Sequence, residues 1–206
     1  MNKGSLIILS GPSGVGKDTI LKSLLNQNEK IKLSISATTR PKREYEENGK
    51  DYFFISEDKF LKIAQSGGML EFANYCGNYY GTPKEFVDKS LDAGFDVILE
   101  IETEGALKVI ENLDDVVSIF ILPPSILTLK ERLIKRGSDK LEIIEKRVEK
   151  AEIEIKRSAK YKYVVVNDDL DKCVEYINSI IKVERLLTQK DNTINEVLNV
   201  EKTVYW

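Results

Sequence analysis

The sequence contains no histidine. This absence excludes Ser-His and Cys-His nucleophile pairs, histidine-ligated metal sites and any phosphohistidine intermediate. Catalysis by this chain must therefore use carboxylates, lysine, arginine, hydroxyl groups or bound ions.

Cysteines and long hydrophobic runs are also scarce. The two cysteines, Cys76 and Cys173, form no CxxC motif and are too few for a disulfide framework. The apolar run at 6–9 ends just before Gly11 and Pro12, so it is too short for a signal-peptide core or a membrane span. We therefore expect a protein of the reducing cytoplasm without a membrane partner.

The chain has no excess of positive charge. Its 31 Lys and Arg residues stand against 34 Asp and Glu residues, a net charge of −3. A protein that binds duplex nucleic acid usually carries a basic surface, so we expect no nucleic-acid partner. With 206 residues, 42% of them hydrophobic and 32% charged, the composition is that of one sizeable globular domain.

Short apolar segments alternate with helical patterns along most of the chain. Residues 5–10 (SLIILS) read as a strand buried on both faces, and a glycine loop and a helix follow. The same order recurs at 97–99, 116–122 and 163–166, with a last helix that we expect to end at about 188. This alternation predicts an α/β fold with a parallel sheet covered on both faces.

Two stretches interrupt the alternation. Residues 34–90 are more polar and contain an aromatic strand at 52–55, and residues 128–162 carry twelve Lys and Arg against seven Asp and Glu. We interpret both as insertions on the core. The polar tail at 187–206 has apolar residues at helical spacing, which is consistent with a short solvated helix or with a self-association surface, and a homodimer is therefore possible.

The strongest motif is a glycine-rich loop between a strand and a helix. Its spacing, GxxxxGK, is that of a phosphate-binding loop: backbone N–H groups converge on phosphate oxygens, the helix N-terminus favours anions, and the lysine reaches the outer phosphates. The loop consists of Gly11, Pro12, Ser13, Gly14, Val15, Gly16 and Lys17. The next residue is Asp18 instead of the usual Ser or Thr, and a hydroxyl follows only at Thr19, so Asp18 either points away or approaches the phosphates through Mg²⁺.

Two further segments contain groups suited to a phosphorylated ligand. Arg40 and Arg43 can form a fork for a phosphate that the first loop does not hold, although two surface arginines near a proline have the same pattern. Glu71 follows a glycine pair, and a Gly- and Tyr-rich segment at 77–83 comes next; an ordinary turn with an exposed acid is the simpler interpretation of that part alone.

Taken together, these segments resemble the guanylate kinase family from about residue 5 to about residue 185. The matching segments are GPSGVGK (11–17), SATTRPKRE (36–44), NGKDYFF (48–54), LEFANYCGNYYGTP (70–83), LEIETEGA (99–106), FILPPS (120–125), RLIKRG (132–137) and VVVNDDLD (164–171). The resemblance implies ATP-dependent phosphorylation of GMP, and of dGMP as well, to the diphosphate.

The resemblance also implies the domain organisation. We predict a single domain, 1–206, with a three-layer P-loop NTPase core (1–33, 91–126 and 160–186). An insertion that binds the nucleoside monophosphate (about 34–90), a helical lid (about 127–159) and the tail (187–206) complete it.

Guanine presents two adjacent donors beside one acceptor, and a carboxylate with nearby hydroxyls complements that edge. Adenine would place a lone pair against the same carboxylate, an unpaired contact that costs several kcal/mol. By resemblance, Glu71 and Glu102 bind the base and Ser36 and Thr82 lie beside its O6. The GMP phosphate is assigned to Arg40, Arg43, Tyr52 and Tyr80.

The positive insertion supplies the remaining cations. Arg132 and Arg136 lie four residues apart and share a helix face, and Arg147 follows. In the family such arginines descend with the lid onto the ATP phosphates, so we expect Lys17, Arg40 and these three to be catalytic. Asn167 matches an adenine-side position, and Thr19 and Glu100 are expected to hold Mg²⁺, largely through water.

The sequence departs from the family pattern at Asp18, at Tyr45 in place of a usual glycine, and at Glu100 and Glu102, where many members have aspartates. Two other functions fit parts of this pattern. A guanylate-kinase-like binding module without activity usually lacks an intact phosphate loop, and a kinase for another small phosphate acceptor would not need Glu71 with Thr82.

Overall fold

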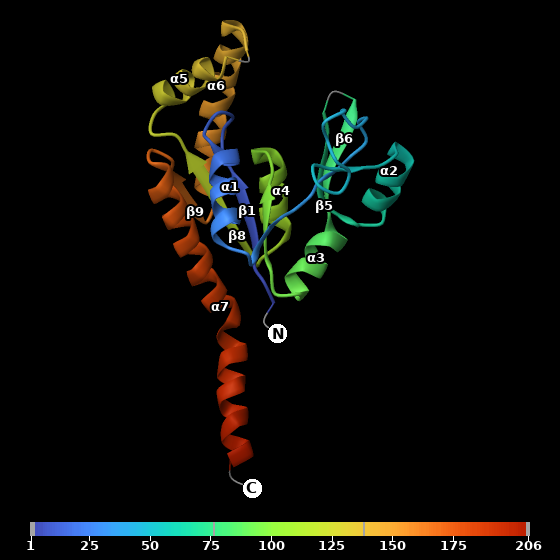
Figure 1. Ribbon diagram of the computed structural model, residues 1–206, viewed down its shortest axis with the longest axis vertical. Coiled ribbons are helices and arrows are strands. Elements are labelled where there is room, and N and C mark those ends of the chain that lie inside the picture. The colour runs from blue at the N-terminus through green and yellow to red at the C-terminus, as the bar shows by residue number, and fades with distance from the viewer. Residues whose placement is uncertain (1–2, 76, 138, 205–206) are drawn as a thin grey trace.

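The computed structural model describes residues 3–75, 77–137 and 139–204. Five strands form a parallel sheet at the centre, in the order β2-β7-β1-β8-β9 (Figure 1). Their bounds are β1 Leu6–Ser10, β2 Ile31–Leu33, β7 Asp96–Glu100, β8 Val116–Leu122 and β9 Tyr163–Val166. The predicted α/β fold with a parallel sheet is therefore confirmed.

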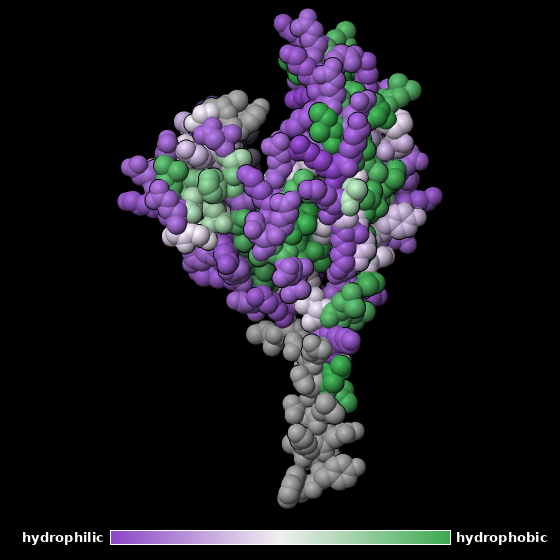
Figure 2. All heavy atoms as spheres, turned by 180° about the vertical axis from the view of Figure 1, so that it is seen from behind, coloured by the Kyte–Doolittle hydropathy of each residue, from purple (hydrophilic) through white to green (hydrophobic). Residues whose placement is uncertain are grey.

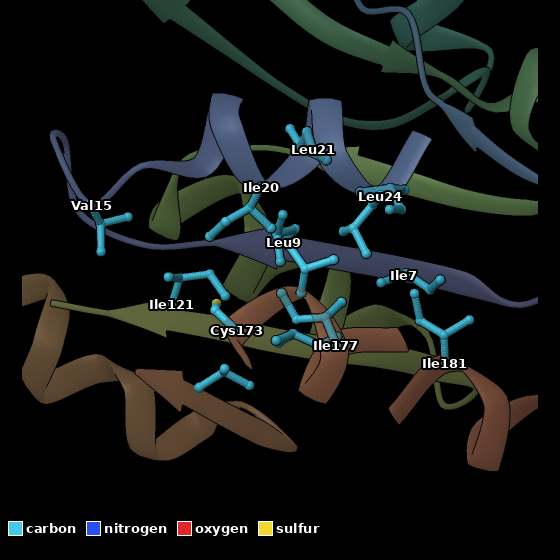
Figure 3. Close-up of a cluster of buried hydrophobic side chains, with 14 of the residues drawn as sticks. Ile7, Leu9, Val15, Ile20, Leu21, Leu24, Ile121, Cys173, Ile177 and Ile181 are labelled. Atoms are coloured by element: carbon cyan, nitrogen blue, oxygen red, sulfur yellow. The ribbon is translucent and has the colours of Figure 1, made fainter. Parts of the chain in front are cut away.

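Helices cover both faces of this sheet. On one face, α1 (Lys17–Gln27) and α7 (Leu170–Val204) pack on β1, and Figure 3 shows Leu9 of β1 between Ile20 of α1 and Ile177 of α7. On the other face, α3 (Lys84–Asp92) and α4 (Thr103–Asn112) pack on the alternate side chains of the same strands. Because successive residues of a strand face opposite layers, a continuous apolar run such as 6–9 is buried completely.

The edge strand β9 is less buried than the alternation of strands and helices suggests. Val165 points into the core, whereas Val164 and Val166 are about half exposed, at 45% and 47%. An edge strand has a neighbour on one side only, which leaves part of its surface to solvent.

A second sheet lies beside the core. It has the order β4-β3-β6-β5, with bounds β3 Ala37–Thr38, β4 Phe53–Phe54, β5 Met69–Tyr75 and β6 Asn78–Pro83. Helix α2 (Glu57–Gln65) packs on it through the fully buried Phe60. The aromatic strand predicted at 52–55 is shorter than expected, because only Phe53 and Phe54 pair with β3.

Two helices, α5 (Ile126–Arg136) and α6 (Leu141–Arg157), form an arm above the carboxyl ends of the core strands, and we call them the lid helices (Figure 1). The Ser125 side chain caps α5, which ends at Gly137 with a positive φ of 68°. A short 3₁₀ turn, Ser158–Lys160, leads from α6 back to the sheet.

The C-terminal helix is longer than the sequence pattern predicted. The expected end at about 188 and the separate short tail helix are both wrong, since α7 runs unbroken from Leu170 to Val204 and extends away from the body (Figure 1). No glycine or proline occurs between 170 and 204 to interrupt it. An ion pair of 3.0 Å between Arg185 and the fully buried Asp96 ties the middle of this helix to the base of the sheet. No helix within the described ranges is long and apolar enough to cross a membrane.

Candidate active site

The phosphate loop, residues 11–17, leaves β1 at its carboxyl end and leads into α1. Gly16 caps the helix with a left-handed φ of 100°, and a Cβ there would lie 2.8 Å from Nδ2 of Asn167. A Cβ on Gly11 would lie 2.6 Å from the carbonyl oxygen of Ile121. The loop therefore fits only with glycine at these positions, and it leaves the backbone N–H groups at the start of α1 available for an anion.

The loop is held from behind through Val15, which is fully buried. Its carbonyl oxygen accepts from Nδ2 of Asn167 at 2.8 Å and from Nη1 of Arg132 at 3.3 Å. Arg132 also donates through Nη2 to the carbonyl of Asn167 at 3.0 Å. Thus the structure brings both predicted residues to the loop, but here they support its backbone.

Lys17 points along the inside of the loop and donates to the carbonyl of Gly11 at 2.7 Å. Burial lowers the pKa of this ammonium, and the negative charge of Glu100 opposes that effect. A cavity of about 240 Å³ opens beside it, lined by Gly11, Ser13, Lys17, Glu100, Ile101, Glu102, Arg147, Lys150 and Glu154. The cavity thus joins the phosphate loop to the lid helices.

The lid helices contribute cations to this cavity. Nη1 of Arg147 lies 3.4 Å from the Ser13 hydroxyl and pairs with Asp139 at 3.2 Å. Lys150, which the sequence analysis did not single out, bridges Glu102 at 2.9 Å and Glu154 at 3.6 Å. Burial raises the pKa of Glu154, and the charge of Lys150 opposes the rise. The cavity is thus lined by acidic as well as cationic side chains.

Of the remaining predicted lid and metal residues, Glu100 lines the cavity, whereas Arg136 and Thr19 are not among its lining residues. Arg136 is exposed in the last turn of α5, and Thr19 is exposed in the first turn of α1. The pKa of Glu100 is raised by burial and further by the neighbouring Asp18, while Lys17 lowers it. Asp18 is exposed in the first turn of α1 and is close enough to Glu100 for the two carboxyl groups to interact.

A second cluster of polar groups lies in the loop between β3 and β4 and on β6. The Arg40 guanidinium lies 5.3 Å from the Tyr52 ring centroid, and that ring meets Tyr80 edge-on at 6.1 Å. The same guanidinium forms a bidentate pair with Glu46 at 2.5 and 2.7 Å. The structure thus brings three of the predicted phosphate-binding residues together, with a carboxylate that the sequence analysis missed.

Arg43 is placed differently. Its side chain lies at the surface and donates to the Tyr45 hydroxyl at 3.0 Å. Tyr45 stands where the family usually has glycine and is 78% exposed. In this conformation the guanidinium of Arg43 is therefore held by Tyr45 at the outer side of the loop.

The predicted base-binding residues meet across two antiparallel strands. Thr82 of β6 is buried and donates its hydroxyl to Oε1 of Glu71 on β5 at 2.8 Å. Burial raises the pKa of Glu71, and the hydrogen bond from Thr82 opposes the rise. A Cβ on Gly105 would lie 3.0 Å from Oε2 of Glu71, so this carboxylate packs against the first turn of α4.

Glu102 and Ser36 complete the predicted set. Glu102 precedes α4 at its N-terminus and is exposed toward the cavity, where it meets Lys150. Ser36 is half-buried just before β3, and its carbonyl accepts from the Phe53 amide at 2.9 Å. Figure 2 shows a hollow between the lobe that carries the second sheet and the lid helices. Two groups of side chains with cations, one on each side, therefore flank this opening.

A phosphate loop at the carboxyl end of a parallel sheet, opposite a second arginine-tyrosine cluster, defines a P-loop phosphotransferase with two substrate sites. A profile of the guanylate kinase family matches residues 3–184. The chain belongs to the guanylate kinase family, and it is an enzyme of the nucleoside monophosphate kinase type, as predicted.

Individual relatives agree with this assignment. The guanylate kinase of Caldanaerobacter subterraneus subsp. tengcongensis is 48% identical over 93% of this chain and 93% of that protein. The guanylate kinase of Lactiplantibacillus plantarum is 47% identical over 91% of this chain and 92% of that protein. A crystal structure of guanylate kinase from Anaplasma phagocytophilum has a TM-score of 0.69 and 34% identity, covering 90% of this chain and 88% of that one.

Proposed function

We propose that this chain transfers the γ-phosphoryl group of ATP to GMP, and also to dGMP, which gives ADP and the guanosine diphosphate. The observation that carries the choice of acceptor is the hydrogen bond between the buried Thr82 and the half-buried Glu71. A carboxylate complements the two adjacent donors of guanine, and the Thr82 hydroxyl, which donates its one proton to Glu71, orients that carboxylate.

The two groups of side chains have separate tasks in this proposal. The phosphate loop with Lys17 holds the ATP phosphates, and Arg40 with Tyr52 and Tyr80 holds the phosphate of GMP. An oxygen of the GMP phosphate attacks the γ-phosphorus while the bond to the β–γ bridging oxygen breaks and ADP leaves. Because the transition state is loose, the protein mainly aligns the two nucleotides and stabilises charge on the equatorial oxygens.

The lid cations fit the same reaction. Arg147 already lies at Ser13 of the phosphate loop, so a small closing movement brings it to the γ-phosphoryl group. Arg136 is exposed near the end of α5 and needs a larger movement. Closure also excludes water, which would otherwise accept the phosphoryl group.

The donor set beside Lys17 suits Mg²⁺. Magnesium binds oxygen ligands, usually one or two carboxylates with substrate phosphates and water, and Asp18 and Glu100 lie side by side there. These two residues would hold the ion together with the nearby Thr19, and the ion would neutralise phosphate charge. We expect Asp18→Asn to raise the Mg²⁺ concentration for half-maximal rate about tenfold, whereas the exposed control Asp92→Asn leaves it unchanged. Equal values for Asp18→Asn and the wild type would remove Asp18 from the metal site.

One assay tests the proposed acceptor. The purified chain is given ATP and Mg²⁺ with GMP, dGMP, AMP, CMP or UMP, and ADP formation is followed. We expect turnover with GMP and dGMP and at least a hundredfold lower kcat/KM for the other three. Turnover of another acceptor at the rate for GMP would favour a kinase of different specificity, and no turnover at all would favour a binding module.

Location and assembly are part of the proposal. ATP and GMP are cytoplasmic metabolites, and we place the enzyme in that compartment. Exposed apolar side chains on α7 at spacings of four, seven and three residues support a homodimer formed by two copies of this helix. They are Val183, Leu187, Ile194 and Val197.

Light scattering of the full chain tests the dimer. We expect twice the chain mass for the wild type and the single chain mass for Leu187→Glu. The control Lys182→Glu changes the charge of the same helix at an exposed residue outside the apolar stripe and leaves the mass at the dimer value. A wild type of single mass at all concentrations contradicts this part of the proposal.

A further inference from the structure

Glu46 has an unusual environment for a carboxylate in a surface loop. Its side chain is 7% exposed, and that of Arg40, its partner, is 13% exposed. Oε1 and Oε2 accept from Nη2 and Nη1 of Arg40 at 2.5 and 2.7 Å, a bidentate arrangement. Its neighbours Glu44 and Glu47 are exposed, so within this acidic segment only Glu46 is directed inward.

Glu46 also holds the segment that carries the second arginine. Oε2 accepts from the backbone N–H of Arg43 at 2.8 Å, and the Glu46 amide donates to the carbonyl of Arg43 at 3.1 Å. One carboxylate therefore fixes the Arg40 side chain and the Arg43 backbone at once. Removing either partner would leave a buried charge without its hydrogen bonds, so the arrangement is expected to be rigid.

The geometry determines which edge of Arg40 remains for a ligand. A guanidinium has five N–H donors. Nη1 gives its two to Glu46 and to the carbonyl of Pro41, at 2.9 Å for the latter, and Nη2 gives one to Glu46. The donors that these contacts do not use, on Nε and the far side of Nη2, form the other edge of the guanidinium and point away from Glu46. That edge is a second fork with the spacing of two phosphate oxygens. Arg40 also interacts with the side chain of Tyr80, a predicted ligand of the same phosphate.

The charge of Glu46 alone would oppose phosphate binding. The hydrogen bonds and charge of Arg40 lower the pKa of Glu46 to about 2, so the carboxylate is ionised at neutral pH. A fixed negative charge behind Arg40 reduces the attraction of the loop for an anion. Glu46 can therefore favour phosphate binding only if the affinity gained by orienting Arg40 exceeds the affinity lost through the negative charge.

We propose that Glu46 is a positioning residue for the phosphate of GMP, which holds Arg40 so that its Nε–Nη2 edge faces the bound nucleotide. The inference rests on the proposed function, in which Arg40 binds the phosphate of the acceptor nucleotide. The proposal and simple electrostatics predict opposite effects on the affinity for GMP. Neutralising Glu46 makes the loop more positive, which by charge alone would strengthen GMP binding, whereas the proposal predicts weaker binding.

The test compares two ligands that differ only in the phosphate. In Glu46→Gln we expect the Kd for GMP to rise about ten- to a hundredfold, because a misoriented Arg40 guanidinium can no longer form both hydrogen bonds to the phosphate. The Kd for guanosine and the Kd for ATP should stay within twofold of the wild type. Glu44→Gln, which removes an exposed charge from the same loop, is the matched control and should leave all three constants unchanged. Tighter or equal GMP binding by Glu46→Gln overturns the proposal.

Further variants separate positioning from general stability. If Glu46 acts through Arg40, Glu46→Gln adds less than twofold to the Kd for GMP in an Arg40→Met background. Glu46→Asp keeps the charge and should recover part of the GMP affinity; it is also the variant to measure if Glu46→Gln does not fold. Equal weakening of GMP and guanosine would show a merely structural role. A wild type that binds no GMP would instead contradict the proposed function.

Discussion

The Thr82 hydroxyl donates to Oε1 of Glu71 at 2.8 Å across the β5–β6 pair, and both side chains lie away from bulk water. The hydroxyl thereby fixes one carboxylate oxygen, while Oε2 lies against the first turn of α4. A carboxylate whose two oxygens are oriented before the ligand arrives loses little entropy on binding. The pair is thus suited to select one base.

Glu71→Gln tests this selection. The variant keeps the size and the acceptor for Thr82 but places an NH₂ donor against a guanine donor. We expect kcat/KM for GMP to fall by about 2–4 kcal/mol of transition-state stabilisation, roughly thirty- to a thousandfold. The Kd for ATP should not change, because the ATP phosphates rest on the phosphate loop. Steady-state kinetics with GMP decides, and a loss below threefold contradicts the base pocket.

The same substitution should have the opposite effect on stability at neutral pH. Burial raises the pKa of Glu71 above its ordinary value of 4.5, so the folded state favours the neutral carboxyl. Its contribution to the free energy of unfolding is therefore full below about pH 4.5 and falls as the pH rises through the raised pKa. Because Gln does not ionise, the Tm of Glu71→Gln should be higher than that of the wild type at pH 8, and the two Tm values should be equal at pH 4.

Thermal unfolding followed by circular dichroism at both pH values measures this difference. Glu104→Gln, at an exposed site on α4, is the control. Its Tm should differ from that of the wild type by the same small amount at pH 4 and at pH 8. A Tm of Glu71→Gln below that of the wild type at pH 8 would contradict the burial argument.

Lys17→Ala should abolish most turnover while the fold persists. Within the described residues Lys17 hydrogen-bonds only to the carbonyl of Gly11, so the substitution breaks one such contact of the fold. Loss of one preorganised cation at the transferred group typically costs about a hundred- to a thousandfold in rate. Turnover and far-ultraviolet circular dichroism are measured together, with Lys22→Ala on the same helix as control. Near-normal turnover would refute the phosphate-loop assignment.

Binding of both substrates should close the opening in Figure 2. The second sheet and the lid helices carry cations that must meet two anionic nucleotides and then exclude water. We expect a two-substrate analogue, with adenosine and guanosine joined by phosphates, to reduce the radius of gyration in solution scattering. ATP alone should produce a smaller change. Superimposable profiles with and without the analogue would speak against closure.

Local features of the site could be predicted from the sequence, because their geometry depends on neighbouring residues. The loop from Gly11 to Lys17 is such a case: strand, glycines and helix follow one another within a few residues. The extent of α7 was mispredicted although the signal was present, since the absence of glycine and proline after 170 favours continuation. The polarity of the residues after 187 favours a separate tail, whereas the absence of helix breakers favours one continuous helix, and the structure has the continuous helix.

Features that depend on contacts between distant segments could not be predicted in this way. Three acids, Glu44, Glu46 and Glu47, lie close together, and nothing in their order shows that the middle one is buried against Arg40. Likewise, the donation of Arg132 to the carbonyl of Val15 joins residues 117 positions apart. Such contacts depend on how the loop and the lid pack, which the spacing of residue types does not encode.

The carbonyl of Val15 accepts from Asn167 of the core and from Arg132 of the lid, so its two lone pairs are divided between a fixed and a movable partner. In the proposed closure, in which Arg132 would turn toward a ligand, Asn167 would keep its hydrogen bond to this carbonyl. The carbonyl is then never without a donor, and the shape of the loop does not depend on the lid position. Opening and closing can therefore repeat in each turnover without remaking the cradle that receives the next ATP.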